Sequence, residues 1–150
     1  MQDIETVTAF LAALNANDFH TVETYLGDTF VLHGNLSKQP GKYVFLGLFM
    51  GLAYGFPDYA FNLQHVCVAG GTVEAIVQFT GTHTGNLILS LVIPGLPAIP
   101  PTDKKLSRPA YCLAFTLRHE KIVTIDLDHG QDSIFLWILK QLNIALSSAS

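Results

Sequence analysis

The first third of the chain has the hydrophobic periodicity of helices. Four apolar residues recur at intervals of three or four positions: Ile4, Val7, Leu11 and Leu14. This spacing places them on one face of an amphipathic helix. A short helix is expected to follow over residues 18–26, with Asp18 as its N-terminal cap, and then a short strand over residues 30–33.

Residues 41–55 predict a third helix that is apolar on nearly every side. A helix of this kind is expected to be buried rather than to lie on the surface. It contains Gly47 and Gly51 and ends at Gly55, although glycine is unfavourable in a helix. We therefore expect these glycines to mark the close approach of another element.

After residue 58 the period changes from that of helices to that of strands. The expected elements are strands 59–69 and 72–85 around a turn at Gly70-Gly71, strands 106–118 and 122–129, and a helix over 133–142. Helices first, then hairpins, then a closing helix predict a single α+β domain over residues 1–150. In the simplest assembly, a curved antiparallel sheet carries the helices on its concave side.

The balance of apolar and charged residues adds a prediction about function. Apolar residues make up 49% of the chain and charged residues only 13%, whereas a typical globular domain has about 25% charged residues. The surplus of apolar surface is expected to line a pocket between sheet and helices, a subunit interface, or both.

Charge and cysteine content narrow the class of protein further. The formal net charge of −4 and the scattered Lys and Arg residues argue against a nucleic-acid partner. No apolar run approaches the about 20 residues that span a membrane, and the acidic N-terminus lacks the basic start of a secretion signal. Cys67 and Cys112 lie in strand-like runs, as buried reduced thiols do. We expect a cytoplasmic protein.

Two motifs connect the chain to a known family. Gly81-Thr82-His83-Thr84-Gly85 ends the second predicted strand, and Pro100-Pro101-Thr102-Asp103-Lys104 precedes the third. Further matching pieces occur in order along the chain: His33, Phe56-Pro57-Asp58, Lys121-Ile122 and Gln141-Leu142. In this series the chain resembles the SnoaL-like polyketide (ester) cyclases of the nuclear-transport-factor-2-like, or ketosteroid-isomerase-like, superfamily.

The resemblance implies a cone-shaped α+β roll that forms a homodimer and encloses an apolar pocket. It also implies an aldol closure in which an Asp base on the last long strand is aided by a His, with no metal or organic cofactor. The chain departs from the family in the longer, apolar spacer at residues 86–99, and in Asp126, which stands where the family commonly has Trp. Fold alone does not determine chemistry.

His83 is the first candidate catalytic residue. It shares strand parity with Val77 and Phe79, so its imidazole is expected on the apolar side of its strand. A histidine there can exchange a proton near neutral pH, and a carboxylate partner would orient it. The alternative is a core histidine that is hydrogen-bonded to the backbone.

Asp126 and Asp128 are the candidate bases. By alternation they share one face of the last strand with Ile122 and Thr124. A carboxylate in an apolar pocket has a raised pKa, which suits the removal of a proton next to a carbonyl. The alternative is that this face is exposed and that Ile125 turns inward.

The candidates for substrate binding are one histidine and eight largely aromatic side chains. They are His33, Tyr43, Phe49, Met50, Tyr54, Phe79, Tyr111, Phe115 and Trp137. His33 closes the first strand, and its alternative is a position that faces solvent or a dimer partner. For each aromatic residue the alternative is a place in the core.

Other chemistries find no support in the sequence. It has no Gly-x-Ser-x-Gly elbow, no phosphate-binding glycine loop and no histidine pair at zinc spacing. Residues 126–132 carry oxygen ligands at alternate positions but lack the later Glu of a calcium loop, and Asp132 also fits the cap of the last helix. No metal and no cofactor are therefore expected.

Three functions remain open at this level. The first is a cofactor-independent cyclase or isomerase of a carbonyl compound, with Asp126 or Asp128 as base and His83 assisting. The second is a non-catalytic binding protein for an apolar metabolite, with residues 87–101 as a lid or doorway. The third is an interaction module that dimerises through the outer face of its sheet.

Overall fold

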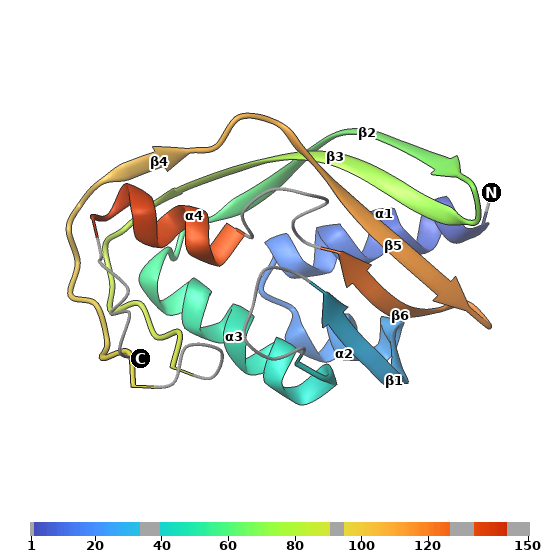
Figure 1. Ribbon diagram of the computed structural model, residues 1–150, viewed down its shortest axis with the longest axis horizontal. Helices are drawn as coiled ribbons and strands as arrows, with labels where there is room; N and C mark the ends of the chain where they lie inside the picture. The colour runs from blue at the N-terminus through green and yellow to red at the C-terminus, as the bar shows by residue number, and fades with distance from the viewer. Residues whose placement is uncertain (1, 34–39, 91–94, 127–133, 144–150) are drawn as a thin grey trace.

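The computed structural model describes residues 2–33, 40–90, 95–126 and 134–143. The helices are α1 (Gln2–Asn15), α2 (Phe19–Tyr25), α3 (Lys42–Gly55) and α4 (Ile134–Gln141). The strands are β1 (Leu26–His33), β2 (Ala60–Ala69), β3 (Thr72–Thr82), β4 (Lys105–Ser107), β5 (Tyr111–Arg118) and β6 (Lys121–Asp126). Figure 1 shows the four helices gathered on one side of the long strands.

The strands form one curved, open sheet in the order β1-β6-β5-β3-β2, with β4 paired to the end of β3. The hairpin and neighbour pairs are antiparallel, whereas β1 and β6 run parallel. This confirms the predicted α+β fold but makes the sheet mixed rather than antiparallel. The parallel pair is possible because most of the chain, including α3, connects β1 to β6.

Strict alternation on β3 defines the concave face of the sheet. Its buried residues are Val73, Ala75, Val77 and Phe79, and the residues between them are only partly buried. Phenylalanine rings from the helices complete this core, with ring centroids of Phe49 and Phe135 5.4 Å apart and those of Phe10 and Phe115 6.0 Å apart. The sheet therefore buries one face against α1, α3 and α4.

α3 is buried on one face only. Phe45, Leu48 and Phe49 point into the core, whereas Tyr43 and Tyr54 are exposed. The expectation of a helix buried on every side is therefore wrong. An apolar helix exposes whatever face no other element covers, and among the described residues nothing covers this one.

Two of the three glycines of α3, Gly51 and Gly55, mark the close approach of another segment, as expected. A Cβ atom on Gly51 would lie 2.1 Å from the carbonyl oxygen of Ile88, and one on Gly85 would lie 2.0 Å from that of Tyr54. The backbone N–H groups of Thr84 and Gly85 both donate to the carbonyl oxygen of Gly55, at 3.1 and 3.2 Å. The end of α3 thus packs directly on the segment that follows β3.

The apolar segment after β3 buries part of its described side chains. Leu87 and Ile99 exchange two backbone hydrogen bonds of 3.0 and 2.9 Å. Their side chains and that of Leu89 are buried. No helix among the described residues is long and apolar enough to cross a membrane.

Candidate functional site

The carboxylate of Asp126 belongs to the outer face of the sheet. Phe115 and Ile125 are register partners on β5 and β6, and both are buried on the concave side. Asp126 and its partner Ala114 are the next positions along these strands, so they point to the opposite face. The other candidate base, Asp128, and the candidate helix cap Asp132 lie outside the described residues.

A β-bulge explains why alternation fails on β6. Thr116 pairs with Thr124, but Leu117 pairs with Ile122, so Val123 is an extra residue. Such a residue reverses the alternation of side chains. Ile122 is consequently buried while Thr124 points outward, and the predicted common face of Ile122, Thr124 and Asp126 is wrong.

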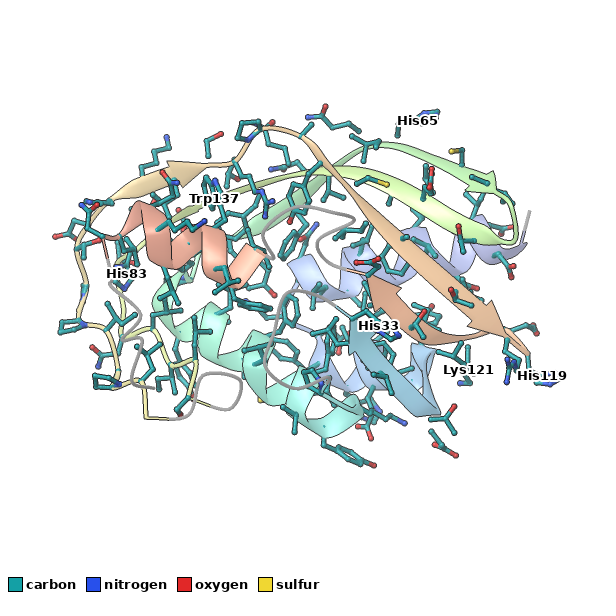
Figure 2. All side chains as sticks on the ribbon, viewed as in Figure 1. His33, His65, His83, His119, Lys121 and Trp137 are labelled. Carbon is teal, nitrogen blue, oxygen red and sulfur yellow. The ribbon has the colours of Figure 1, made fainter. Side chains whose placement is uncertain are left out.

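The histidine next to Asp126 is His33. The two residues end the parallel strands β1 and β6 and are partners in their register. Partners in a parallel ladder point to the same face, so His33 lies with Asp126 on the outer side. Figure 2 shows His33 and His83 well apart in the molecule. The structure therefore does not bring His83 and Asp126 together.

His83 lies on the concave side, as its parity predicted, and is fully buried. Its ring stacks on Phe56, with centroids 5.2 Å apart and an interplanar angle of 22°. Nδ1 lies 2.9 Å from the Thr102 hydroxyl and accepts the Thr102 backbone N–H at 3.3 Å. Because Nδ1 accepts a hydrogen bond, the proton of the neutral ring belongs on Nε2.

The surroundings keep His83 neutral. Desolvation by burial lowers the pKa of His83, and the carbonyl groups of Ile99 and Gly85 and the charge of Asp103 oppose this only in part. Nε2 is buried and makes no hydrogen bond within the part of the chain that the structure describes. In this state His83 is a hydrogen-bond donor rather than a base.

A second polar group lies under α4. Tyr111 is 6% exposed, and its hydroxyl oxygen has no hydrogen-bond partner among residues 2–33, 40–90, 95–126 and 134–143. Burial raises the pKa of Tyr111 strongly, and Arg108 opposes this shift. The Arg108 guanidinium carbon lies 3.9 Å from the centre of the Tyr111 ring and 5.7 Å from that of Trp137. Trp137 lies between α4 and the sheet (Figure 2).

An aromatic row connects these two polar groups along the concave face. Phe56 stacks on His83 and lies 5.7 Å from Phe79, and Phe79 lies 6.4 Å from Trp137. His83 and Arg108 are the buried polar or charged side chains among the described residues, and the hydroxyls of Tyr59 and Tyr111 are buried as well. No carboxylate of the described chain is buried with them. The concave face therefore offers hydrogen-bond donors and a cation, but no carboxylate base among the described residues.

One cavity between the sheet and the helices is very small. An interior cavity of about 10 Å³ is lined by five phenylalanines and four aliphatic residues: Phe10, Leu11, Leu14, Phe45, Phe49, Phe61, Leu113, Phe115 and Ile125. Leu113 is two residues from Tyr111 on the same face of β5, so the cavity adjoins the Tyr111 position. A cavity of this size is no larger than the space that one water molecule needs.

The predicted pocket walls fall into two groups. Phe49, Phe79, Tyr111 and Phe115 are buried on the concave side, and Trp137 packs against them. The remaining three, Tyr43, Met50 and Tyr54, lie on the outer face of α3 and are exposed to solvent. Those three line no part of the interior.

An open polar groove with a larger volume than the interior cavity lies elsewhere in the described chain. Its volume is about 360 Å³, and α2, the start of β1, Lys42 and Lys121 line it. Lys42 pairs with Asp28 at 3.6 Å, and the ammonium of Lys121 donates to the carbonyl oxygen of Thr24. The groove shares no lining residue with the interior cavity, and both of its lysines already have partners within the protein. No group of three or more potential metal ligands occurs in the described ranges.

Sequence reasoning missed Arg108 and the hydrogen-bonding role of Thr102. Arginine is mostly exposed in proteins, so its type gave no reason to place Arg108 inside. A signal was present, since Arg108 has the same parity as the apolar Leu106 in the predicted strand. Thr102 lies in the Pro-Pro-Thr motif, but its contact with His83 depends on the fold of the segment between them.

A family model matches most of the chain, and solved structures share its fold. Residues 7–125 match the model of the SnoaL-like domain. Among curated proteins, none matches the sequence. A proposed SnoaL-like polyketide cyclase from Jannaschia sp. CCS1 is similar in structure, with a TM-score of 0.71 and 17% identity over 97% of this chain and 94% of that chain.

Two further solved structures share the fold. IdmH, a proposed polyketide cyclase from Streptomyces antibioticus, has a TM-score of 0.69 and 20% identity, over 95% of this chain and 99% of IdmH. An LEH-like epoxide hydrolase from M. tuberculosis has a TM-score of 0.58 and 20% identity, over 83% of this chain and 80% of that chain. At these identities the likeness concerns the fold.

Proposed function

Because this chain belongs to the family of SnoaL-like domains, we propose that it binds a small, largely apolar molecule that carries a carbonyl group. The ligand lies on the concave face of the sheet beneath α4, with its carbonyl oxygen on the Tyr111 hydroxyl. The two cysteines are free thiols, which fits a single cytoplasmic domain over residues 1–150.

One observation carries this proposal: the hydroxyl of Tyr111 is buried and has no acceptor among the described residues. A buried polar group without a partner costs about 1–3 kcal/mol. A ligand acceptor would remove that cost, and the phenylalanine rings nearby would pack on its apolar body. The cation of Arg108, which stacks on the Tyr111 ring, favours the partial negative charge of a carbonyl oxygen.

The interior cavity of about 10 Å³ is too small for this ligand, so side chains beside it must move to admit the ligand there. α4 lies over the neighbours of this site, because Trp137 is 5.7 Å from the Arg108 guanidinium and Phe135 packs on Phe49. Its backbone is tied to the sheet side by a hydrogen bond of 3.2 Å from the Lys104 ammonium to the carbonyl oxygen of Gln141. Outward movement of this short helix would open space beside the existing cavity.

A matched pair of ligands tests the binding proposal. 1-Tetralone and tetralin have the same fused rings and differ by one carbonyl group. The protein has one tryptophan, Trp137, so its fluorescence reports ligand beneath α4. We expect tighter binding of 1-tetralone than of tetralin, by about fivefold to tenfold. Tyr111→Phe should remove the preference while tetralin binding stays unchanged.

The same site supports a second, catalytic function, namely isomerase or cyclase chemistry by proton abstraction next to the carbonyl. Tyr111 and Arg108 would stabilise the enolate oxygen, and His83 would donate from Nε2 to a longer substrate. The base in this proposal is Asp128, the candidate that remains, because Asp126 belongs to the outer face of β6. The proposal therefore requires that the strand alternation expected for these two residues ends at Asp126, the last residue of β6.

Deuterium exchange separates catalysis from binding. In D₂O, the base removes a proton from C2 of 1-tetralone, and the enolate takes a deuteron back at the same carbon. The catalytic proposal expects protein-accelerated exchange, its loss in Asp128→Asn, and its retention in the matched variant Asp126→Asn. Binding of 1-tetralone without accelerated exchange would make the protein a non-catalytic binder.

A further inference from the structure

The carboxyl end of α4 is bound by a lysine from the segment that precedes β4. The ammonium of Lys104 donates to the carbonyl oxygen of Gln141, the last residue of α4, at 3.2 Å. The last carbonyl groups of a helix lack partners within the helix and form the negative end of its dipole. Lys104 therefore stabilises α4 both by a hydrogen bond and by its charge. In Figure 1 the segment that leads into β4 runs past this end of α4.

The backbone around Lys104 is itself fixed to the end of β3. The N–H of His83 donates to the carbonyl oxygen of Lys104 at 2.9 Å, and the N–H of Asp103 donates to the carbonyl oxygen of His83 at 2.8 Å. The N–H of Lys104 also donates to the Thr102 hydroxyl oxygen at 3.4 Å, and this hydroxyl contacts the His83 ring. Lys104 therefore connects α4 to the core through a fixed stretch of backbone.

α4 depends on the rest of the protein for its helical structure. It has eight residues, of which four are buried: Ile134, Phe135, Ile138 and Leu139. Isolated helices shorter than about 12–15 residues are marginal in water. If these side chains leave the core, the backbone hydrogen bonds of α4 are therefore lost as well. Opening of α4 is a local unfolding of the helix, and any contact that holds α4 on the core opposes it.

We propose that α4 is a lid that opens by local unfolding, and that Lys104 is the latch that holds it closed. This inference rests on the proposed function, because the carbonyl ligand enters beneath α4. Lys104 and Gln141 are both exposed, so water can replace their hydrogen bond when it breaks. An exposed contact between a cation and a helix end changes an equilibrium by about twofold to fivefold. The latch therefore sets how often the lid opens without preventing its opening.

Hydrogen exchange of the α4 amides tests the lid and the latch without any ligand. In the wild type these amides should exchange faster than those of the central strand β3, because local unfolding costs less than unfolding of the whole chain. Lys104→Met keeps an unbranched side chain but removes the ammonium. We expect it to accelerate exchange in α4 by about twofold to fivefold.

Two further variants control for other effects of the substitution. Lys104→Arg keeps a cationic donor and should restore the slow exchange of α4. Lys105→Met removes the neighbouring ammonium, which is exposed on β4 and whose charge acts on Asp58. It should leave exchange in α4 unchanged. Each variant changes an exposed side chain, so all of them should fold like the wild type, as far-UV circular dichroism can verify.

Salt distinguishes the charge of Lys104 from the packing of its side chain. Raising the ionic strength from about 0.01 M to about 1 M screens an exposed charge. The ratio of α4 exchange rates between Lys104→Met and the wild type should therefore fall towards one. A ratio that salt leaves unchanged would mean that Lys104 acts through packing, and the latch would be wrong.

The result expected is faster α4 exchange in Lys104→Met than in the other three chains. Equal exchange in Lys104→Met and the wild type would overturn the latch, and equal protection of α4 and β3 would overturn the lid. Binding of 1-tetralone separates these outcomes from failure of the proposed function. Its limiting association rate should rise in Lys104→Met by the factor measured for exchange. A wild-type chain that binds no 1-tetralone overturns the proposed function, whereas normal binding with unchanged α4 exchange overturns only the latch.

Discussion

His33 and Asp126 are register partners at the ends of the parallel strands β1 and β6. Their side chains therefore share the outer face of the sheet, while His83 is buried on the concave face. A histidine and a carboxylate do lie on neighbouring strands of this protein, but on the side away from the aromatic core. The polar chemistry of the concave face depends instead on Tyr111, Arg108 and His83.

Removing the Tyr111 hydroxyl should stabilise the protein without ligand. Tyr111→Phe eliminates a buried, unpartnered polar group, so we expect a gain of about 1 kcal/mol and a rise in Tm of about 2–4 °C. Tyr59→Phe is the matched control, because the Tyr59 hydroxyl is buried but donates to the carbonyl oxygen of Leu14 at 2.6 Å. That variant should lose about 1 kcal/mol. Urea denaturation measures both, and equal losses would show that Tyr111 has a partner.

The burial of His83 should make stability depend on pH. Desolvation lowers the pKa of His83 in the folded chain, whereas the unfolded chain has a pKa of about 6.5. As the pH falls below that value, the unfolded state binds a proton on His83 more tightly than the folded state does. The free energy of unfolding therefore decreases. The contribution of neutral His83 to stability is complete above about pH 7.

The variant His83→Asn isolates this contribution. An Asn amide oxygen can accept the Thr102 N–H in place of Nδ1 but does not titrate. Guanidinium unfolding at several pH values should give a shallower decline towards acid pH in the variant than in the wild type. Parallel curves would mean that His83 is protonated equally well in both states.

The backbone contact between α3 and the segment after β3 should tolerate no side chain. In Gly51→Ala the new Cβ would overlap the carbonyl oxygen of Ile88 at 2.1 Å, and relief requires a shift of backbone. We expect a loss of about 2 kcal/mol or more. Gly41→Ala, with its nearest contact at 3.7 Å, should cost at most about 1 kcal/mol. Similar Tm values for the two variants would contradict this account of the packing.

Entry of a ligand should be limited by an opening step. Because the interior cavity is only about 10 Å³, the observed association rate of 1-tetralone should level off as its concentration rises. Phe135→Leu weakens the contact of α4 with Phe49 and should raise the limiting rate. Stopped-flow recording of Trp137 fluorescence gives these rates. A linear rise up to the solubility limit would show that the site is open beforehand.

Regular strands made parts of this site predictable from sequence. The inward position of His83 follows from unbroken alternation along β3, from Val73 onward. The same rule failed on β6, because the bulge at Val123 has no local signal in the sequence. One extra residue places the side chains that follow it on the face opposite to the predicted one.

The exposed face of α3 and the burial of Arg108 could not be predicted from the sequence. The reason differs from the one that applies to β6. An apolar helix does not reveal which of its faces other elements will cover, so Tyr43 and Tyr54 were placed in the pocket although both are exposed. Arg108 is buried because aromatic rings of β5 and α4 hold its guanidinium. The contact with Trp137 joins residues that are far apart in the sequence and exists only in the folded chain.

A crystal structure of the protein with 1-tetralone tests the binding proposal most directly. The account predicts the ligand on the concave face beneath a displaced α4, with its carbonyl oxygen within about 3 Å of the Tyr111 hydroxyl oxygen. Ligand in the polar groove beside Lys42 and Lys121, or an interior unchanged at saturating 1-tetralone, would contradict it.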